Sequence, residues 1–287
     1  MKCFFTSDLH GQTLRYALLF DAVSLEAPDA VFLGGDLFDV IHHFPPAASD
    51  LTPFFEQSLA DKIRKLRHDD GLDTRFFVIM GNDDPRCYEP ILINADHEGL
   101  ISYVHARTLP FKDLYVTGYS YVPPTPFRLK DWERYDVSGY VDPGTLPPDE
   151  GLRTVRTGAE EASYATIAED LDKIVKAAPV ERTIFLFHAP PYGGKLDVAY
   201  RGTHIGSIAI QRFITRHQPL LTLHGHIHES PDMTGSWQEK IGRTYAFSGV
   251  NDAPGLTLIR FDTNRLETAT RQNIPPTGER TNAEAAD

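Results

Sequence analysis

Cysteine is scarce in this sequence. Cys3 and Cys87 are the only two, and neither has a neighbour at a Cys-x-x-Cys spacing. This scarcity excludes a disulfide framework and a thiolate zinc site. We expect both cysteines to be buried as small apolar residues, and we predict a reducing compartment, the cytoplasm.

Long apolar runs and positive charge are also in short supply. No stretch approaches the length of a membrane span, and polar Thr6, Ser7 and Asp8 follow the first apolar residues too early for a signal peptide. Lys and Arg number 28 against 40 Asp and Glu, a formal net charge of -12 at pH 7. We therefore expect no membrane partner and no long nucleic acid. Small anionic substrates stay open, because bound cations reverse the local charge; the oligomeric state is not indicated.

Apolar runs alternate with helical patterns in the first half of the chain. The 287 residues, 41% of them hydrophobic, can bury one large core. We predict strands at residues 3–5, 30–33 and 75–80, and helices over 11–25 and about 54–66. Near-continuous apolar strands separated by helices are typical of βαβ units, with both faces of the sheet covered. The fold class is therefore α/β.

The second half is less regular. Residues 122–158 are rich in Pro and Gly and form a predicted loop-rich insertion in a domain over 1–262. Its aromatic residues could stack on a flat ligand or pin the loop to the domain, and we favour pinning. They are Phe127, Trp132, Tyr135 and Tyr140.

Regular elements resume after this insertion. Helices are expected over 164–175 and 205–216, and strands at 114–119, 183–187, 220–223, 243–247 and 256–261. From Asn264 the sequence is polar, so we predict a frayed C-terminal tail over 263–287.

Five short segments carry metal-type side chains, and most follow an apolar run. They are Asp8-Leu9-His10, Gly35-Asp36, Gly81-Asn82-Asp83, His188-Ala189-Pro190 and Gly225-His226-Ile227-His228. Strand ends of an α/β sheet converge on one edge, which is the usual place for a ligand. Asp, Asn and His side chains without Cys suit a hard or intermediate divalent metal. The pattern predicts a metal-dependent hydrolase.

Taken singly, each segment has a plainer explanation. Asp8 and Asp36 could cap helices, and Asn82 could be a turn residue. In an extended segment, residues two apart point to the same side. The Asp8-x-His10 and His226-x-His228 pairs are therefore expected to present both of their side chains to one ion.

In this order and with these glycines, the segments resemble the calcineurin-like metallophosphoesterase family. The resemblance runs from Asp8 to about Ser248. Within the family, residues 81–85 and 225–229 look most like the Icc-related predicted phosphoesterases. The resemblance implies a four-layer αββα sandwich, in which two mixed β-sheets are flanked by helices.

The resemblance also implies a binuclear metal centre. Its two divalent ions would be Mn²⁺ first of all, with Fe, Zn, Ni or Co as alternatives. Asp36 would bridge them, and a hydroxide shared by the ions would attack a small phosphoester, a phosphodiester or another substrate with a good leaving group. One ion would be held by Asp8, His10 and His228, and the other by Asn82, His188 and His226.

One position departs from the family pattern. Many members have His directly after the Asn, where it is thought to protonate the leaving group and to pair with the second Asp of Gly-Asp-x-x-Asp. This chain keeps that second Asp as Asp39 but has Asp83 in place of the His. An ionised carboxylate is a poor proton donor, so this step is in question.

Three explanations stay open for the departure. Another residue protonates, with His42, His43 and His204 as candidates; or the leaving group needs no acid; or Asp83 is itself protonated between the metals and Asp39. We favour an acidic leaving group. The candidate catalytic residues are Asp36, Asp39, Asp83 and His204.

Two other functions are compatible with these motifs. A nuclease of the same fold is one, and a metal-binding scaffold without turnover is the other. The acidic charge argues against the nuclease, and the full set of ligand types argues against the scaffold. His224, on the strand before Gly225, is expected to be structural or to orient a ligand.

Overall fold

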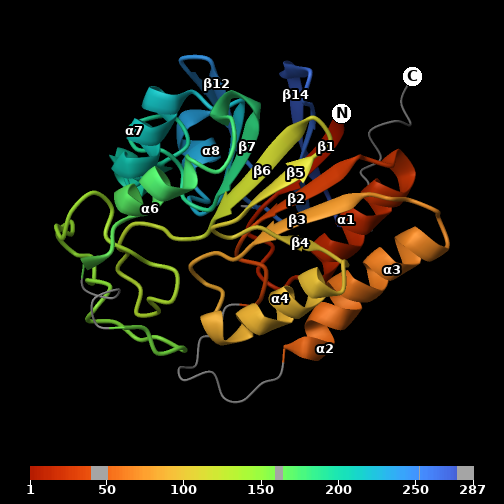
Figure 1. Ribbon diagram of the computed structural model, residues 1–287, viewed down its shortest axis with the longest axis horizontal. Helices are drawn as coiled ribbons and strands as arrows, with labels where there is room; N and C mark the ends of the chain where they lie inside the picture. Colours follow the sequence, from red (N-terminus) through yellow and green to blue (C-terminus); the bar gives the residue numbers. More distant parts are fainter. Residues whose placement is uncertain (40–50, 159–163, 252, 277–287) are drawn as a thin grey trace, which may run out of the picture.

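Two six-stranded sheets face one another, and helices cover their outer faces (Figure 1). The computed structural model describes residues 1–39, 51–158, 164–251 and 253–276. His42 and His43, two candidate proton donors, lie outside the described residues.

The first sheet carries the N-terminal βαβ units. Its strand order is β14-β13-β1-β2-β3-β4. Strands β1 to β4 are parallel, whereas β13 and β14 are antiparallel. The strands are β1 (Lys2–Thr6), β2 (Ala30–Gly34), β3 (Arg75–Ile79), β4 (Ser102–Tyr103), β13 (Leu256–Asp262) and β14 (Arg265–Ile274).

The second sheet comes from the rest of the chain, in the order β11-β12-β10-β7-β6-β5. Its four inner strands are parallel, and its two edge strands are antiparallel to their neighbours. The strands are β5 (Thr108–Phe111), β6 (Leu114–Tyr119), β7 (Thr183–Phe187), β10 (Leu221–His224), β11 (Gln238–Ile241) and β12 (Thr244–Ser248).

Side-chain alternation along the strands builds two separate cores. In β3, Phe77 and Ile79 join the cluster between the sheets, which also contains Leu186 of β7. Phe76 and Val78 point the other way and join the cluster beneath the helices. Burial of both faces explains why these strands are apolar throughout. The predicted αββα sandwich of two mixed sheets is confirmed.

Helices α1, α3 and α4 lie along the outer face of the first sheet, and α6 and α7 along that of the second (Figure 1). Within the described ranges, the helices of four residues or more are α1 (Thr13–Glu26), α2 (Thr52–Phe55), the π-helical turn η1 (Glu56–Ala60), α3 (Asp61–His68), α4 (Glu89–His97), α6 (Ile167–Ile174), α7 (Ile208–His217) and α8 (Ser230–Thr234). None of the helices in the described ranges is long and apolar enough to span a bilayer.

Helix α7 begins later than expected. We predicted a helix over 205–216 that opened near His204, but His204 ends the short strand β9 (Thr203–His204), which pairs with β8 (Val198–Ala199). The helix starts at Ile208, because the Ser207 side chain accepts the Ile210 N–H and caps it. Helix α4 and the short strands β4, β5 and β11 were not predicted.

The predicted frayed tail is wrong for Arg265–Ile274. These residues form β14, which runs antiparallel along β13. Of the ten residues in β14, Leu266 alone is buried. An edge strand that exposes both faces needs no alternating apolar pattern, and therefore its sequence reads as a polar tail.

The segment that contains the predicted insertion is irregular. Over 120–158 the backbone makes isolated bridges but no helix or longer strand. Trp132 and Tyr135 are buried, which agrees with pinning, whereas Phe127 and Tyr140 are exposed. The Trp132 ring packs edge-on against His105, with 4.8 Å between ring centroids.

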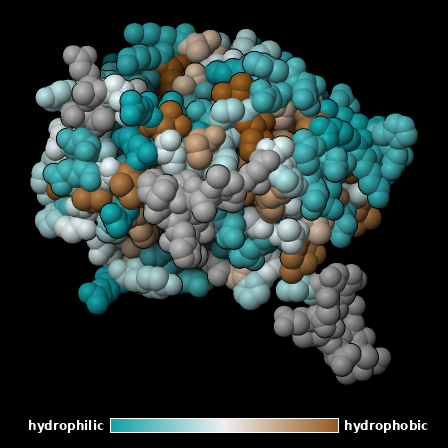
Figure 2. Space-filling model, turned by 90° about the horizontal axis from the view of Figure 1, so that it is seen from below, coloured by the Kyte–Doolittle hydropathy of each residue, from teal (hydrophilic) through white to brown (hydrophobic). Residues whose placement is uncertain are grey.

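The molecular surface is mixed in character. Figure 2 shows hydrophobic residues scattered among hydrophilic ones on the visible part of one face. Both cysteines are free thiols; Cys3 is buried but Cys87 is exposed. The expectation that both are buried is therefore wrong for Cys87, which lies in the turn η2 (Arg86–Tyr88) and not in a core strand.

Candidate metal centre

The five predicted segments meet at one edge of the sandwich, where β1, β2, β3, β7 and β10 end. Backbone hydrogen bonds join them directly. The Asp8 N–H donates to the Gly35 carbonyl at 2.9 Å, and the Gly225 N–H donates to the His188 carbonyl, also at 2.9 Å. Parallel strands place their carboxyl ends together, so this convergence follows from the topology.

Four side chains form a compact group. Asp8, His10, Asp36 and His228 each offer one ligand atom, and the four atoms lie within 4.8 Å of one another. The His228 Nε2 is 3.2 Å from the His10 Nε2 and 3.2 Å from the Asp8 Oδ1. The His10 Nε2 is 4.0 Å from the Asp36 Oδ2. This spacing suits a single divalent ion among them.

The second group is built around His188. Its Nδ1 is 2.8 Å from the Gly34 carbonyl, to which it donates. Its Nε2 lies 3.3 Å from the Asp36 Oδ2 and 3.0 Å from the Asn82 Oδ1. In a neutral ring, that Nε2 carries a lone pair, so three acceptors would face one another. Either a proton or a cation has to lie between them.

His226 completes the second group. Its ring centroid is 5.3 Å from that of His188, and its backbone N–H donates to the Asp8 carboxylate. Burial lowers the pKa of His226 to about 3. A neutral imidazole is the form that binds metals.

The remaining pKa shifts show how strongly the carboxylates act on the rings. Burial alone would lower the pKa of His188, but Asp36 raises it to about 10. Asp8 likewise overcomes burial and raises the pKa of His228 to about 9. Burial would raise the pKa of both carboxyl groups, yet the imidazoles hold them below their usual range. A bound cation would replace these protons, because metal ligands must be deprotonated.

The backbone reaches this geometry by a route that we did not predict. The expectation that Asp8-x-His10 and His226-x-His228 lie on extended segments is wrong. Asp8, His10 and His226 have φ values of 59°, 46° and 74°, and Asp36 has 51°. Residues other than glycine rarely adopt this left-handed region, and those that do are concentrated at functional sites. Sharp turns, rather than strand alternation, bring the side chains together.

Two glycines permit the close packing of these turns. A Cβ on Gly81 would lie 2.2 Å from the Asp36 Oδ1, and a Cβ on Gly225 would lie 2.6 Å from the Asp8 Oδ2. Both distances are well below contact, so any side chain there would displace a carboxylate of the centre.

Asp84 is a supporting residue that sequence reasoning missed. It is fully buried and accepts N–H bonds from Leu37, Phe38 and Gly81 at 2.9 to 3.1 Å. Burial and the nearby Asp36 raise the pKa of Asp84 to about 7, although the three N–H donors act to lower it. Asp84 thereby ties the loop of Asp36 to the loop of Asn82. The run Asn82-Asp83-Asp84 was the available signal.

Arg15 and Asn251 support the first segment and were also missed. The Arg15 guanidinium donates to the carbonyl of Asp8 at 2.9 Å and to that of Gly255 at 3.0 Å. The Asn251 amide donates to the Ser7 carbonyl at 2.6 Å. No motif marks either residue, because each acts on backbone carbonyls, including those of Gly255 and Ser7, more than 200 residues away from Arg15 and Asn251 respectively.

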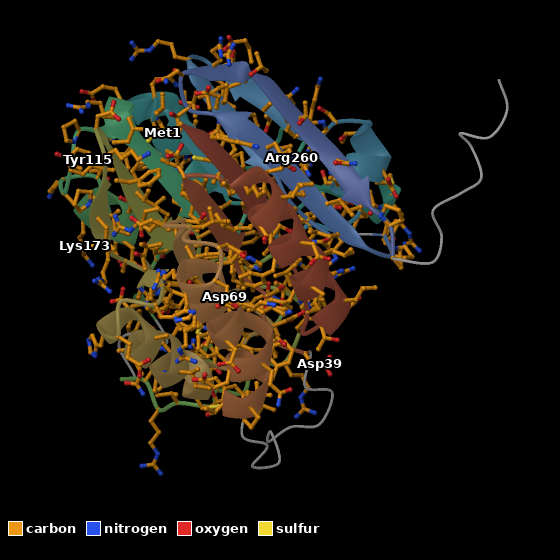
Figure 3. The ribbon with its side chains drawn as sticks, turned by 90° about the vertical axis from the view of Figure 1, so that its right-hand side faces the viewer. Met1, Asp39, Asp69, Tyr115, Lys173 and Arg260 are labelled. Atoms are coloured by element: carbon orange, nitrogen blue, oxygen red, sulfur yellow. The ribbon has the colours of Figure 1, made fainter. Side chains whose placement is uncertain are left out.

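Asp83 lies beside the centre, and Asp39 lies at its exposed margin. The Asp83 N–H donates to the Asp36 Oδ1 at 2.9 Å, and the Asn82 amide donates to the Asp83 carboxylate at 2.9 Å. Burial, Asp36 and Asp84 raise the pKa of Asp83 to about 8. Asp39 is exposed, at the rim of the molecule in Figure 3, and no described contact joins it to Asp83.

The two other histidines have different surroundings. The His204 Nδ1 is 2.8 Å from the buried Asp197, and its ring packs against Tyr192. Its described contacts do not include the seven candidate ligands. His224 is buried, with its ring nitrogens 2.8 Å from the Ala189 carbonyl and 2.8 Å from the Thr222 hydroxyl. His224 therefore supports the His188 loop, in line with the structural interpretation.

Comparison with known proteins concerns the family and the fold. A family model described as calcineurin-like phosphoesterase matches residues 1–230. The crystal structure of TT1561 of Thermus thermophilus is similar, with a TM-score of 0.56 and 19% identity over 95% of this chain and 98% of that one. A further solved structure has a TM-score of 0.59 and 16% identity, over 95% and 98% of the two chains. At these identities the likeness concerns the fold alone. No curated protein sequence matches.

Proposed function

The chain belongs to the calcineurin-like phosphoesterase family, and we propose that it hydrolyses small phosphate esters with two divalent ions, Mn²⁺ first among them. The observation that carries this proposal is the environment of His188. Its Nε2 faces oxygens of both Asp36 and Asn82, an arrangement that a cation between them would stabilise.

We assign the ligands by their proximity. The first ion is assigned to Asp8, His10 and His228, and the second to Asn82, His188 and His226, with Asp36 between them. The chemistry of the donors fits: oxygen and imidazole nitrogen suit manganese, iron, zinc, nickel or cobalt. When bound, two such ions would neutralise charge on the phosphoryl oxygens and activate water for an in-line attack.

The protein's own contribution is to orient these ligands. The Gly34 carbonyl holds the His188 ring in one tautomer, and the Asp8 carboxylate fixes the turn of His226 by accepting its backbone N–H. Partners of this kind fix a ligand ring and its lone pair, and changing them typically costs about 10 to 100-fold in metal affinity or activity.

Leaving-group protonation is the step at which this chain differs. Asp83 owes its raised pKa to burial and to the carboxylates of Asp36 and Asp84. A cation held by Asp36 would offset that charge, so we assign Asp83 as an ionised carboxylate during turnover. We therefore propose substrates whose leaving groups depart without a proton, such as aryl or pyrophosphate-like groups.

A substrate panel with added manganese tests this proposal. It compares phosphate monoesters, diesters, cyclic nucleotides and pyrophosphates, each as an aryl and an alkyl ester where both exist. We expect aryl esters to be cleaved at least roughly 100-fold faster than alkyl esters, the size of a typical general-acid contribution. Equal rates would contradict the absence of a proton donor. No turnover of any ester, in a protein that binds manganese, would favour a scaffold.

Asp83→His is the decisive variant, because it restores the residue that many family members carry. It should raise alkyl-ester hydrolysis much more than aryl-ester hydrolysis. Asp83→Asn is the matched control: it removes the charge without adding a proton donor, so it should leave the aryl-to-alkyl ratio high.

We also propose a cytoplasmic location. Two unpaired thiols support it, one of them exposed at Cys87, since free thiols persist in reducing compartments. Oxidation of Cys87 in protein extracted from its native cells would contradict this location.

A further inference from the structure

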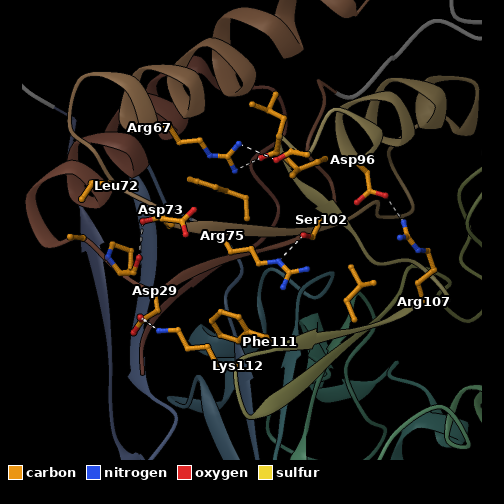
Figure 4. A pocket seen from close by; sticks show the side chains of 18 residues that line it. Asp29, Arg67, Leu72, Asp73, Arg75, Asp96, Ser102, Arg107, Phe111 and Lys112 are labelled. Atoms are coloured by element: carbon orange, nitrogen blue, oxygen red, sulfur yellow. Dashed lines mark hydrogen bonds and ion pairs between the residues drawn. The ribbon is translucent and has the colours of Figure 1, made fainter.

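A second cavity opens at the opposite end of the first sheet from the candidate metal centre. It has a volume of about 850 Å³ and is lined by residues at the starts of β2 and β3 and by residues of β4 and β5 (Figure 4). Arg75, the first residue of β3, is six residues before Gly81. At about 3.3 Å per residue, the two ends of this strand are roughly 20 Å apart. The cavity is therefore separate from the site described above.

The charge of its lining differs from that of the chain. Four cationic side chains, Arg67, Arg75, Arg107 and Lys112, face three carboxylates, Asp29, Asp73 and Asp96. Four positive charges against three negative ones leave +1, whereas the whole chain carries -12. A locally positive cavity on an acidic protein attracts small anions.

Two of the cations already have ionic partners. Arg107 lies 2.6 Å from an Asp96 oxygen, and Lys112 forms an ion pair with Asp29. These pairs neutralise two of the three carboxylates. The third, Asp73, is exposed and forms no ion pair among the described residues.

Arg67 and Arg75 make their side-chain hydrogen bonds to neutral groups among the residues that the structure describes, and Asp96, which is paired with Arg107, offsets the charge of Arg75 only in part. Arg67 donates to the carbonyls of Gly99 and Leu100, at 3.0 and 2.9 Å. Arg75 donates to the Ser102 hydroxyl at 3.0 Å and to the Pro110 carbonyl at 2.6 Å. The Arg67 Nε is buried without a hydrogen-bond partner. Figure 4 shows Arg67 reaching in from α3 and Arg75 from the start of β3.

Neutral partners position a guanidinium but do not compensate its charge. Arg75 is partly buried over the Phe77 ring, and burial lowers its pKa. Both arginines are held in place by carbonyl groups, so little side-chain entropy remains to be lost on binding. Pre-organised guanidinium forks are well suited to carboxylates and phosphates.

We propose that this cavity binds a small organic dianion, a phosphate monoester or a dicarboxylate, between Arg67 and Arg75. Two guanidinium groups match two negative charges, whereas a monoanion would compensate only one. Leu72, Leu100 and Leu109 in the lining provide apolar surface for a compact carbon body. The volume suits a metabolite rather than a macromolecule. The assignment does not depend on the function proposed for the metal centre.

Calorimetric titration of the intact protein with inorganic phosphate and with succinate tests the proposal. We expect saturable binding of at least one of them, and the preferred probe distinguishes phosphate from dicarboxylate chemistry. The double variant Arg67→Gln/Arg75→Gln should bind roughly 10 to 100-fold more weakly, because two charge-assisted contacts are lost.

Two matched variants separate this site from its surroundings. Arg107→Gln removes a cation of the same lining that is already paired, so binding should persist. His226→Ala alters the candidate metal centre, where phosphate could also bind, and binding should again persist. Arg75→Lys keeps the charge without the planar fork and should give intermediate affinity. If the double variant does not unfold cooperatively, and is therefore not properly folded, Arg75→Lys is tested in its place.

Three results would overturn the assignment. They are no saturable binding of either anion to the unmodified protein, equal binding to the double variant, and loss of binding in His226→Ala. The last result would place the anion at the metal centre instead.

Discussion

Two regions of this molecule lack helix and strand, and they are built in opposite ways. The turns of the candidate metal centre place four side-chain residues at positive φ: Asp8, His10, Asp36 and His226. The insertion over 120–158 has none outside glycine. The metal-centre turns are short and strained, whereas the insertion is long and relaxed.

Polar groups show the same contrast. In the insertion, the buried Lys130 Nζ is 2.5 Å from a Glu133 oxygen and 2.8 Å from the Thr125 carbonyl, so its charge is compensated within the segment. At the metal centre, the His188 Nε2 lies 3.3 Å from an Asp36 oxygen and 3.0 Å from the Asn82 oxygen, so a proton or a cation has to lie between them. The insertion thus compensates its buried charge internally, whereas the charged groups of the metal centre are arranged around a space for a cation.

Asp36→Asn should give the largest effect and sharpen this comparison. Removal of its charge is expected to lower kcat/KM on an aryl phosphodiester by at least about 100-fold, since even residues that only orient ligands cost up to this much. The unfolding midpoint of the metal-depleted protein should fall, because the protonated ring of His188 loses the carboxylate that stabilises its charge. Asp39→Asn, exposed and at the margin, is the control with the smaller effect. Unimpaired turnover of Asp36→Asn would refute the site.

Lys130→Met should act on stability instead. Glu133 would remain fully buried without its partner, and breaking a buried pair costs roughly 3–5 kcal/mol. Guanidinium unfolding measures this loss. Activity per folded molecule should be retained. Lys130→Met combined with Glu133→Gln should recover stability, because the amide keeps an acceptor for Thr125 without a charge. A single variant as stable as the unmodified protein would break the comparison.

The smallest expected effect concerns pH. His105, beneath Trp132, has its pKa lowered to about 3 by burial and by Arg86 and Arg134. The unfolded chain takes up this proton near pH 6.5 and the folded chain does not, so stability falls as the pH drops below 6.5. The loss attributable to His105 is about 2 kcal/mol between pH 7 and pH 5.

Unfolding curves of His105→Phe and the unmodified protein, measured across this pH range, isolate that contribution. The variant lacks the titrating ring and should lose less stability on acidification. His97→Phe serves as the control, since this ring is exposed at the end of α4 and away from the insertion. Identical slopes for His105→Phe and the unmodified protein would show that His105 is protonated in the fold.

The layers of the sandwich and the convergence of the five segments could be predicted from the sequence. The backbone conformation of the turns at the metal centre could not. The strand β3 is apolar on both faces because both are buried, so its apolar run predicts a strand from the sequence alone. The structure brings all seven predicted side chains to one edge; their metal binding stays a proposal. The left-handed conformations of Asp8 and His226 were not predictable, because contacts with distant segments impose them.

The residues that support the metal-centre loops were also not predicted. Asp84 bonds to N–H groups of Leu37 and Phe38, almost fifty residues away. No local pattern reports such a contact, and therefore the carboxylate resembles any polar turn residue until the chain is folded.

The polar edge strand β14 has a consequence for the life of the protein in a crowded solution. Its outer margin offers backbone donors and acceptors to any extended chain that meets it. The strand carries charged side chains of both signs at Arg265, Glu267 and Arg271. A second molecule that paired there would have to bring its own strand against these charges. The polar side chains that make β14 resemble a tail in the sequence thus oppose self-association and amyloid-like stacking at this edge of the sheet.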